Sequence, residues 1–399
     1  MIKRKHIITI ICAIVLIFIA YSFRLLNTDT SNGRVYKVGY VYVGDASNPY
    51  TANFLKAQEA IEETYGDKIE SIALYNISEG NEEEALVKLA KEGCDIIFAT
   101  SYGYGPKTKE VAKRYPTVQF CMATGDNAND GEFVENYHTY MGSIHEGRYV
   151  AGVIAGMKLK EYIDEGKIKP EEAKIGYVGA YPYAEVISGY TAFFLGIRSV
   201  VPEATMVVKY TNTWSSYAIE KRVANELIDE GCIVISQHSD TEGPAVACEQ
   251  DSDNDLLIHV GYNISMIDIA PTSSLVSTKI NWEPYMVAAV GAVVDGKNIE
   301  KTVEGNAVLN DVGAGLKEGW VSIVGLNKLL AAEGTEECME KTIKEISGGN
   351  LQVFKGDYTG TNPFDPEDTI DLSEGYEECE MGSAPSFGYV LDDVITVEE

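Results

Sequence analysis

Short runs rich in β-branched and aromatic residues alternate with amphipathic helical segments along most of this chain. Residues 36–42, 69–75 and 95–99 are the first predicted strands, and each is followed by a predicted helix. This alternation predicts parallel sheets whose two faces are covered by helices. The pattern is interrupted by an acidic, lysine-rich stretch at 160–174 and then starts again. We therefore expect two similar α/β lobes rather than one wide sheet.

The predicted lobes are doubly wound parallel sheets joined by a hinge. The first lobe is expected to contain residues 34–141 together with about 264–345. The second lobe is expected to contain 142–263 and part of 346–399, which is a tail rich in loops.

An uncharged apolar run at residues 7–23 follows three basic residues near the start of the chain. A basic flank before such a run is typical of a secretory signal peptide or a single membrane anchor. An uncleaved anchor is favoured, while a cleaved signal and a lipoprotein remain alternatives; Cys12 lies inside the run rather than after it. Residues 1–26 are predicted to be this anchor or signal segment and 27–33 a short tether. The remaining chain is then expected outside the cytoplasm.

The formal net charge of −29 comes from 61 acidic and 32 basic residues. Such a surface repels nucleic acid, so a DNA- or RNA-binding role is not expected. The cysteine spacings match no zinc motif and the histidines are scattered, so no metal and no cofactor are predicted. Cys94 and Cys232 are expected to be buried small hydrophobes. Cys338 and Cys379 lie in acidic surroundings, and a disulfide between them is left open.

Catalytic motifs give no named set of residues. Ser101 lacks the G-x-S-x-G turn, and the G-x-x-x-x-G-K-[ST] phosphate loop does not occur. His238 and Asp240 have a spacing that could orient a proton transfer, but a loop histidine with satisfied hydrogen bonds is the more common outcome. The protein is therefore expected not to be an enzyme.

The loops that follow the predicted strands are the places where a parallel-sheet protein binds ligands. Nearly all of them carry an aromatic ring, an amide or a carboxylate, which suits a planar polar molecule. The alternative is that the rings only cap the core. The predicted ligand-binding residues are Asn48, Tyr50, Ser101, Tyr102, Tyr104, Asp126, Trp214, His238, Asp240, Tyr262, Asn263 and Trp282.

A series of short segments between residues 37 and 320 adds a family resemblance through its order and spacing. The segments are FATSYGY at 98–104, VAKRYP at 111–116, HEGRYVAG at 145–152, IGYVGAYP at 175–182, FLGIRS at 194–199, NTWS at 212–215, QHSD at 237–240, GY at 261–262 and NWEPY at 281–285. In this arrangement the chain resembles the basic membrane protein family of ABC-transporter solute receptors. The resemblance implies a type I periplasmic binding-protein fold that captures a purine nucleoside or nucleobase and delivers it to a membrane permease.

The same resemblance implies roles for individual residues. Trp214 matches a family aromatic residue, His238 and Asp240 match a Gln-His-x-Asp motif, and Trp282 matches Asn-Trp-x-Pro-Tyr. Such residues in the family stack on the base or hold its polar edges.

Three positions depart from the family pattern. Asn48 and Asn263 stand where the family has an acidic residue, and Tyr50 stands where it has Trp. Because an amide can donate a hydrogen bond where a carboxylate only accepts one, the identity of the ligand stays open.

These observations predict a monomeric receptor, tethered outside the cell membrane, that supplies a purine nucleoside or base to an ABC permease. An extracellular sensor that signals without transport is the alternative, and an uncleaved anchor favours it. A nucleoside-processing enzyme is a third hypothesis, which only turnover of a bound nucleoside would support.

Overall fold

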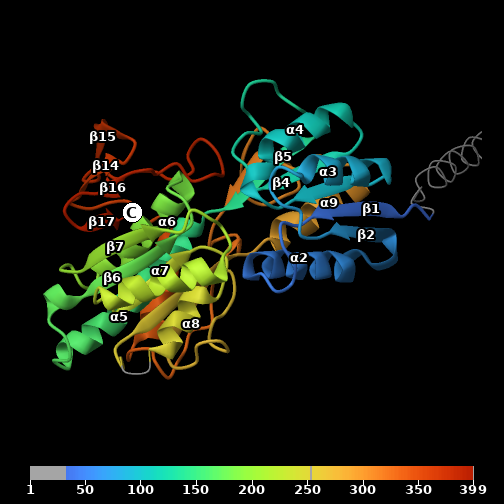
Figure 1. Ribbon diagram of the computed structural model, residues 1–399. Helices are drawn as coiled ribbons and strands as arrows, with labels where there is room; N and C mark the ends of the chain where they lie inside the picture. The colour runs from blue at the N-terminus through green and yellow to red at the C-terminus, as the bar shows by residue number, and fades with distance from the viewer. Residues whose placement is uncertain (1–32, 252–253, 399) are drawn as a thin grey trace, which may run out of the picture.

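The computed structural model describes residues 33–251 and 254–398, which form two α/β lobes side by side (Figure 1). The predicted anchor at 1–26 and nearly all of the predicted tether lie outside the described residues. Among the helices of the described ranges, none is long and apolar enough to cross a membrane. The predicted α/β class with two lobes is confirmed.

The first lobe is built on a seven-stranded, doubly wound sheet in which all neighbouring strands are parallel except the edge strand β11, which is antiparallel to β12. Helices α2 (Pro49–Tyr65) and α9 (Glu283–Asp295) cover one face, and α3 (Glu82–Lys91) and α4 (Gly105–Arg114) cover the other. Across the sheet the strands are β11 (Asn306–Val308), β12 (Asp311–Ala314), β5 (Tyr137–Gly142), β4 (Gln119–Ala123), β3 (Ile96–Ala99), β1 (Tyr36–Val41) and β2 (Ile69–Leu74).

The second lobe repeats this plan with its own seven-stranded sheet. Helices α5 (Ile144–Asp164) and α6 (Ala184–Arg198) cover one face, and α7 (Tyr217–Asp229) and α8 (Gly243–Gln250) cover the other. Across the sheet the strands are β13 (Val321–Val324), β10 (Ser274–Ile280), β9 (Ile258–Tyr262), β8 (Val234–His238), β6 (Lys174–Gly179), β7 (Thr205–Tyr210) and β17 (Ile395–Glu398).

The chain crosses between the lobes three times, first after β5, close to the predicted boundary at 141, and then at two positions that differ from the predicted boundaries. The return to the first lobe was expected at about 264, but β10 pairs with β9 in the second sheet, so the chain returns only after Ile280. The final crossing was expected near 345, but it follows β12, because β13 already pairs with β10. Both differences arise because β10 is an inner strand of the second sheet, which strand propensity alone does not reveal.

The three crossings lie next to one another and are hydrogen-bonded together. The backbone N–H of Ser143, after β5, donates to the carbonyl of Ala314, after β12, at 2.8 Å. The N–H of Asn281, after β10, donates to the carbonyl of Trp320 at 2.7 Å. Because the crossings are bonded side by side, they form one hinge between the lobes.

Helices α5 and α6 pack closely through glycine. A Cβ atom added at Gly152 would lie 2.0 Å from the carbonyl oxygen of Phe193, and one at Gly196 would lie 2.1 Å from that of Tyr149. Only glycine allows these backbones to approach so closely.

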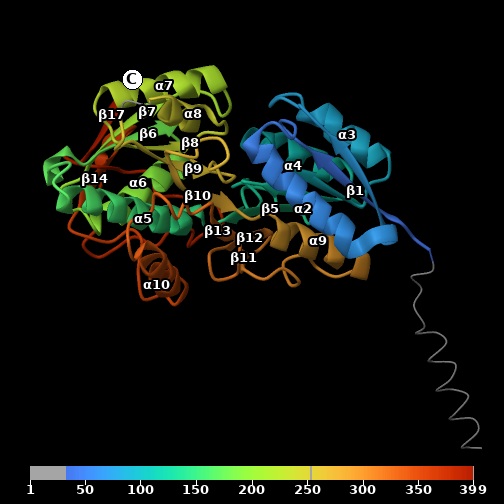
Figure 2. The ribbon, with the colours of Figure 1, turned by 90° about the horizontal axis from the view of Figure 1, so that it is seen from below.

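The C-terminal residues fold back onto the second lobe (Figures 1 and 2). Helix α10 (Thr335–Ser347) packs against α5. Strands β14 (Thr359–Asn362), β15 (Asp365–Asp371) and β16 (Val390–Leu391) form a small antiparallel sheet, and β17 joins the main sheet beside β7.

The remaining helical elements of the described residues are 3-10 turns at Gly66–Lys68, Tyr102–Tyr104 and Pro170–Glu172.

The cysteines of the described chain are free thiols. Cys94 and Cys232 are buried, as predicted. The disulfide left open between Cys338 and Cys379 is not formed. Cys338 packs at the edge of the second lobe's core, whereas the Cys379 thiol donates to the carbonyl of Ser383 at 3.3 Å.

The core of the first lobe has an aromatic centre beside the hinge. Trp282, at the start of α9, is 1% exposed and stacks on Phe54 of α2 with ring centroids 4.4 Å apart. Tyr140 and Tyr285 stack beside it at 3.7 Å. These rings hold α2 and α9 together against the sheet.

We predict that Trp282→Ala lowers the free energy of unfolding by about 3–5 kcal/mol, because it removes a buried ring and leaves a cavity. Urea unfolding followed by circular dichroism measures this loss. Trp282→Phe, which keeps a ring against Phe54, should recover a large part of it. An unchanged unfolding midpoint for the alanine variant would contradict the role of Trp282 in the core.

Candidate ligand-binding cleft

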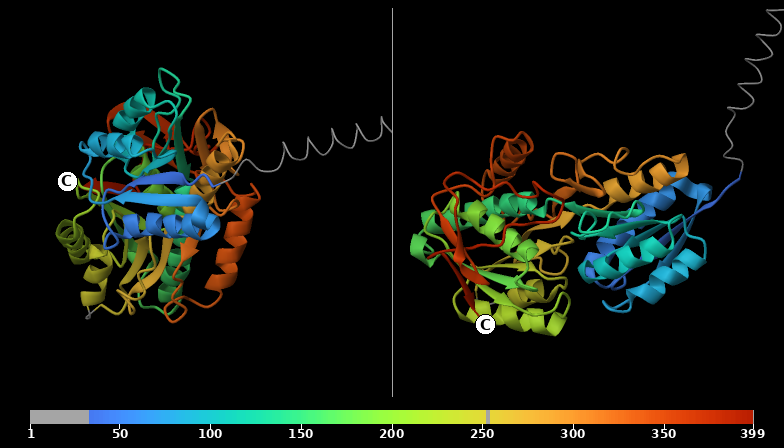
Figure 3. Two further views of the ribbon diagram at one scale, coloured as in Figure 1. Left: turned by 90° about the vertical axis from the view of Figure 1, so that its right-hand side faces the viewer. Right: turned by 90° about the horizontal axis from the view of Figure 1, so that it is seen from above.

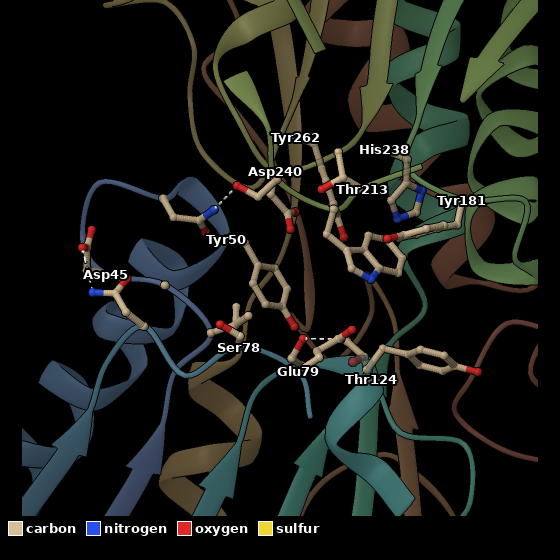
Figure 4. A pocket seen from close by; sticks show the side chains of 18 of the residues that line it. Asp45, Tyr50, Ser78, Glu79, Thr124, Tyr181, Thr213, His238, Asp240 and Tyr262 are labelled. Carbon is tan, nitrogen blue, oxygen red and sulfur yellow. Dashed lines mark hydrogen bonds between the residues drawn. The ribbon is translucent and has the colours of Figure 1, made fainter. Parts of the chain in front are cut away.

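A cavity of about 550 Å³ lies between the two lobes, at the carboxyl ends of strands from both sheets. The first lobe lines it with the loops after β1, β2, β3 and β4, and the second lobe with those after β6, β7, β8 and β9. Figure 3 shows the two lobes and Figure 4 the cavity from close by. This is the size and the topological position expected of a small-molecule site.

Many of the residues predicted from the sequence meet in this cavity although they come from distant segments. Their side chains belong to both lobes, so the fold brings them to one place. The predicted residues that line it are Asn48, Tyr50, Ser101, Tyr102, Trp214, His238, Asp240 and Tyr262. That they bind a ligand remains a prediction.

The other predicted residues lie outside the lining. Trp282 and Tyr104 are core residues, since Trp282 stacks on Phe54 and Tyr104 is fully buried with its hydroxyl donating to a backbone carbonyl. Asn263 is buried behind Asp240, whereas Asp126 is exposed beside Tyr102. Asp126 accepts a hydrogen bond from the Tyr102 hydroxyl at 3.1 Å, and Asn263 donates to Asp240 at 3.2 Å.

Sequence reasoning missed three carboxylates of the lining, Asp45, Glu79 and Glu185. Glu79 lies in the loop after β2, and Glu185 in the first turn of α6, where a carboxylate is common because it suits the helix dipole. In a chain with 61 acidic residues none of the three stands out. Their position could have indicated them, because each lies a few residues after the carboxyl end of a parallel strand.

An aromatic wall covers one side of the cavity. Tyr181 and Tyr183, after β6, stack with centroids 5.1 Å apart, and Trp214, after β7, meets Tyr181 edge-on at 5.4 Å. Tyr102 of the opposite lobe approaches Tyr183 at 5.7 Å. Tyr181 and Trp214 remain partly exposed, so their faces are available to a flat ligand.

Tyr50 reaches from the start of α2 into the cavity, between Asp240 on one side and Ser78 and Glu79 on the other (Figure 4). Burial raises the pKa of its phenol well above the usual range, and the Asp240 charge adds to this effect. The hydroxyl of Tyr50 is therefore neutral and can donate a hydrogen bond.

His238 stands at the end of β8 beside Glu185. Its Nε2 lies 3.2 Å from a Glu185 oxygen. Burial lowers the pKa of the imidazole, and the nearby Arg148 charge lowers it further. Gly189 of α6 makes room for this ring, because an added Cβ would lie 2.6 Å from Nδ1. The arrangement presents a neutral imidazole held by a carboxylate.

Arg148 of α5 lies behind the cavity lining, in contact with Tyr262 and Gln237. It is 1% exposed, its guanidinium lies 4.1 Å from the centroid of the Tyr262 ring, and it donates to the carbonyl of Gln237 at 2.8 Å. A buried cation over an aromatic face is stabilising. Arg148 thus fixes the residues on either side of the His238 ring without entering the cavity.

Asp240 carries a carboxyl group that is almost fully buried. Burial raises its pKa well above the usual range, and repulsion from Glu220 and Glu185 adds to the shift. Asn263 donates to one of its oxygens at 3.2 Å. A carboxyl group in this setting can both donate and accept a hydrogen bond once it is protonated.

The two lobes touch across the mouth of the cavity. The side-chain amide of Asn48 donates to the hydroxyl of Ser215 at 3.1 Å, while its oxygen caps α2 by accepting from the Thr51 N–H at 2.9 Å. Together with the Tyr102–Tyr183 contact, this bond closes the cleft on its open side.

Backbone strain gathers at the ends of the strands that line the cavity. Residues other than glycine rarely adopt a positive φ, and such residues cluster at functional sites. Four of those in the described chain are in the lining or adjoin it: Asn76 (57°), Thr124 (60°), Asn212 (54°) and Asn263 (68°).

Two doubly wound lobes around a polar and aromatic cleft define the class of the protein, which is that of two-lobed solute-binding proteins. A solved solute-binding protein of an ABC transporter from Aeropyrum pernix shares the fold, with a TM-score of 0.64 and 16% identity over 79% of this chain and 92% of its own. The chain belongs to the Bmp family, described as ABC transporter substrate-binding protein PnrA-like, whose model matches residues 36–351. This confirms the resemblance seen in the sequence.

Two relatives are identical to the chain at about a third of the aligned positions. A purine-binding protein of Brucella abortus is 32% identical over 322 residues, which are 80% of this chain and 83% of the relative. A Haloferax volcanii protein, named as a candidate ABC transporter glucose-binding protein, is 31% identical over 327 residues, or 82% and 76% of the two chains.

We predict that Asp240→Asn raises the melting temperature at about pH 8 and that the gain vanishes near pH 4. The folded-state pKa of Asp240 lies above its unfolded-state value, so the stability linked to its proton is lost as the pH rises through the folded pKa. Asparagine keeps the bond to Asn263 but never ionises. Calorimetry across this range measures the difference.

The exposed Asp229→Asn of α7 is the charge-matched control and should show no such pH-dependent gain. A lower melting temperature for Asp240→Asn at every pH would contradict the assignment of a raised pKa to Asp240.

Proposed function

We propose that this protein captures a purine nucleoside or nucleobase in the cleft and delivers it to an ABC permease. The observation that carries the proposal is the cleft itself, in which an aromatic wall faces carboxyl, amide and hydroxyl groups from both lobes. The purine-binding relative from Brucella abortus supports the same ligand class.

The aromatic wall favours a flat ligand. Tyr181 and Trp214 offer their faces to a base, and stacking of a base on an aromatic ring contributes about 1–3 kcal/mol for each ring. A nucleobase fits this geometry better than a saturated sugar alone, which offers no π face.

The polar groups favour a neutral ligand that carries hydroxyl or amine donors. Glu79, Glu185 and Asp240 supply acceptor oxygens, as the diol of a ribose requires. Within the described part of the chain, the lining contains no lysine or arginine, so a phosphate group would find no partner and would meet these carboxyl groups.

The proposed mechanism is closure of the lobes about the hinge. A ligand that contacts both lobes binds the closed form more tightly and therefore shifts the population toward it. The hydrogen bond from Asn48 to Ser215 is a contact between the lobes that the closed form would keep. In this proposal the site captures its ligand without turnover and has no catalytic role.

The proposed location is outside the cytoplasm, where the substrate-binding proteins of this family act. Attachment to the membrane through residues 1–26, a monomeric state and the permease partner are parts of the same proposal. The sensor hypothesis shares the cleft and differs only in the partner that receives the closed form.

We expect isothermal titration of the full-length protein, purified in mild detergent, to show one site of micromolar or tighter affinity for at least one of adenosine, guanosine, inosine and hypoxanthine. Adenosine 5′-monophosphate should bind at least tenfold more weakly than adenosine, because its phosphate enters a cleft lined by carboxyl groups. Heat from glucose alone, or from none of these compounds, would overturn the proposed ligand class.

We predict that Trp214→Ala weakens this binding at least tenfold, since a stacked ring is worth about 1–3 kcal/mol, and leaves the melting temperature of the free protein nearly unchanged. Tyr217→Ala, which removes a 46% exposed ring of α7 outside the cavity lining, is the matched control and should bind like the wild type. Equal affinity in both variants would remove Trp214 from the site.

A further inference from the structure

The C-terminal residues 352–398 extend beyond the family match, which ends at 351. They are nevertheless an integral part of the fold. Phe354 stacks on Phe387 with centroids 4.4 Å apart, and both rings are buried in the core of the second lobe. Strand β17 then pairs with β7. We call this segment the C-terminal extension.

The C-terminal extension also contacts the first lobe. The N–H and the hydroxyl of Ser383 donate to the carboxylate of Asp311 in β12, at 2.5 and 2.6 Å. A few residues earlier, Glu378 accepts from the hydroxyl of Ser188 in α6 at 3.2 Å and from the N–H of Phe387 at 3.2 Å. The extension therefore bridges both lobes beside the hinge.

A second cavity, of about 620 Å³, lies between the C-terminal extension and the hinge. Its lining combines the first turn of α5, the end of β12 with the third crossing at 313–318, the end of α10 with the residues up to 351, and the extension at 352–354 and 376–382. It shares no lining residue with the ligand cleft. Its volume lies within the range of small-molecule sites.

The charge of this second cavity is one-sided. Among the described residues that line this cavity there is no lysine or arginine. The carboxylates that line it are Glu146, Glu318, Glu377, Glu378 and Glu380. A cavity lined by one sign of charge concentrates ions of the opposite sign. Among the salt bridges formed by the described residues, none includes Glu377 or Glu380.

An unpartnered buried imidazole lies in the same lining. His145 of α5 is 7% exposed, and its Nδ1 forms no hydrogen bond with any described residue. Burial lowers its pKa to about 3, so the ring is neutral at physiological pH and has one acceptor nitrogen. Leaving such a group without a partner is costly. Because the His145 side chain lines the cavity, a ligand with hydrogen-bond donors would lie beside an imidazole whose Nδ1 has no partner among the described residues.

The chemistry points to an organic cation rather than a metal ion. In the described chain, no group of three or more His, Cys, Asp or Glu has a geometry that could hold a metal. An ammonium group, by contrast, has donors and no acceptor, which complements carboxylates and a neutral imidazole. We propose that this second cavity binds a small linear molecule with two or more ammonium groups, and that its occupant contacts both lobes at the hinge.

Isothermal titration of the full-length protein with spermidine tests the proposal. The expected result is one site on the wild type, weakened at least tenfold in the double variant Glu377→Gln and Glu380→Gln. Both side chains are exposed and make no ion pair within the described residues, so these changes should leave the fold intact. Circular dichroism of the variant verifies this.

The matched control is Glu337→Gln with Glu340→Gln on α10, which removes the same charge from exposed positions outside the lining. It should bind spermidine within twofold of the wild type. Absence of binding up to millimolar spermidine, equal weakening in both double variants, or a single-site signal from calcium chloride that spermidine does not displace would each overturn the proposal. None of these outcomes depends on the nucleoside cleft.

Discussion

The hydrogen-bonded hinge is the constraint on which the rest of the structure depends. Three crossings leave the sheets within one small region, and the bonds from Ser143 to Ala314 and from Asn281 to Trp320 hold them side by side. Because every crossing leaves its lobe here, the carboxyl ends of both sets of parallel strands face one another. The cleft is a consequence of this arrangement, since four strands of each sheet deliver residues at their carboxyl ends to the same cavity.

The protonation states of the titratable groups in the cleft follow from their burial between the lobes. Asp240 and His238 lie at the end of one strand, and burial moves both pKa values toward the neutral form, upward for the acid and downward for the imidazole. Arg148, on the first helix after the hinge, supports Tyr262 from behind. The cleft thus offers neutral donors, acceptors and aromatic faces, which suits an uncharged polar ring compound more than an ion.

Much of the fold could be predicted from the sequence because strand-helix alternation has local signals. The lobe boundaries could not, because the membership of β10 and β13 depends on pairing between distant segments. Loop position correctly placed Trp214 and Asp240 at the cavity, yet it misplaced Trp282, whose ring turns inward to stack on Phe54. Side-chain direction at a helix start is set by tertiary packing, and a single sequence does not record it.

Trapping tests most directly whether the two lobes enclose a nucleoside or base. In the variant Asn48→Cys with Ser215→Cys, the two thiols replace groups that lie 3.1 Å apart across the mouth. After a short bifunctional thiol reagent joins them in the presence of bound adenosine or guanosine, the account predicts that the nucleoside stays with the protein through gel filtration. The single variants, treated identically, should release it. Equal loss from the joined and unjoined proteins would contradict enclosure between the lobes.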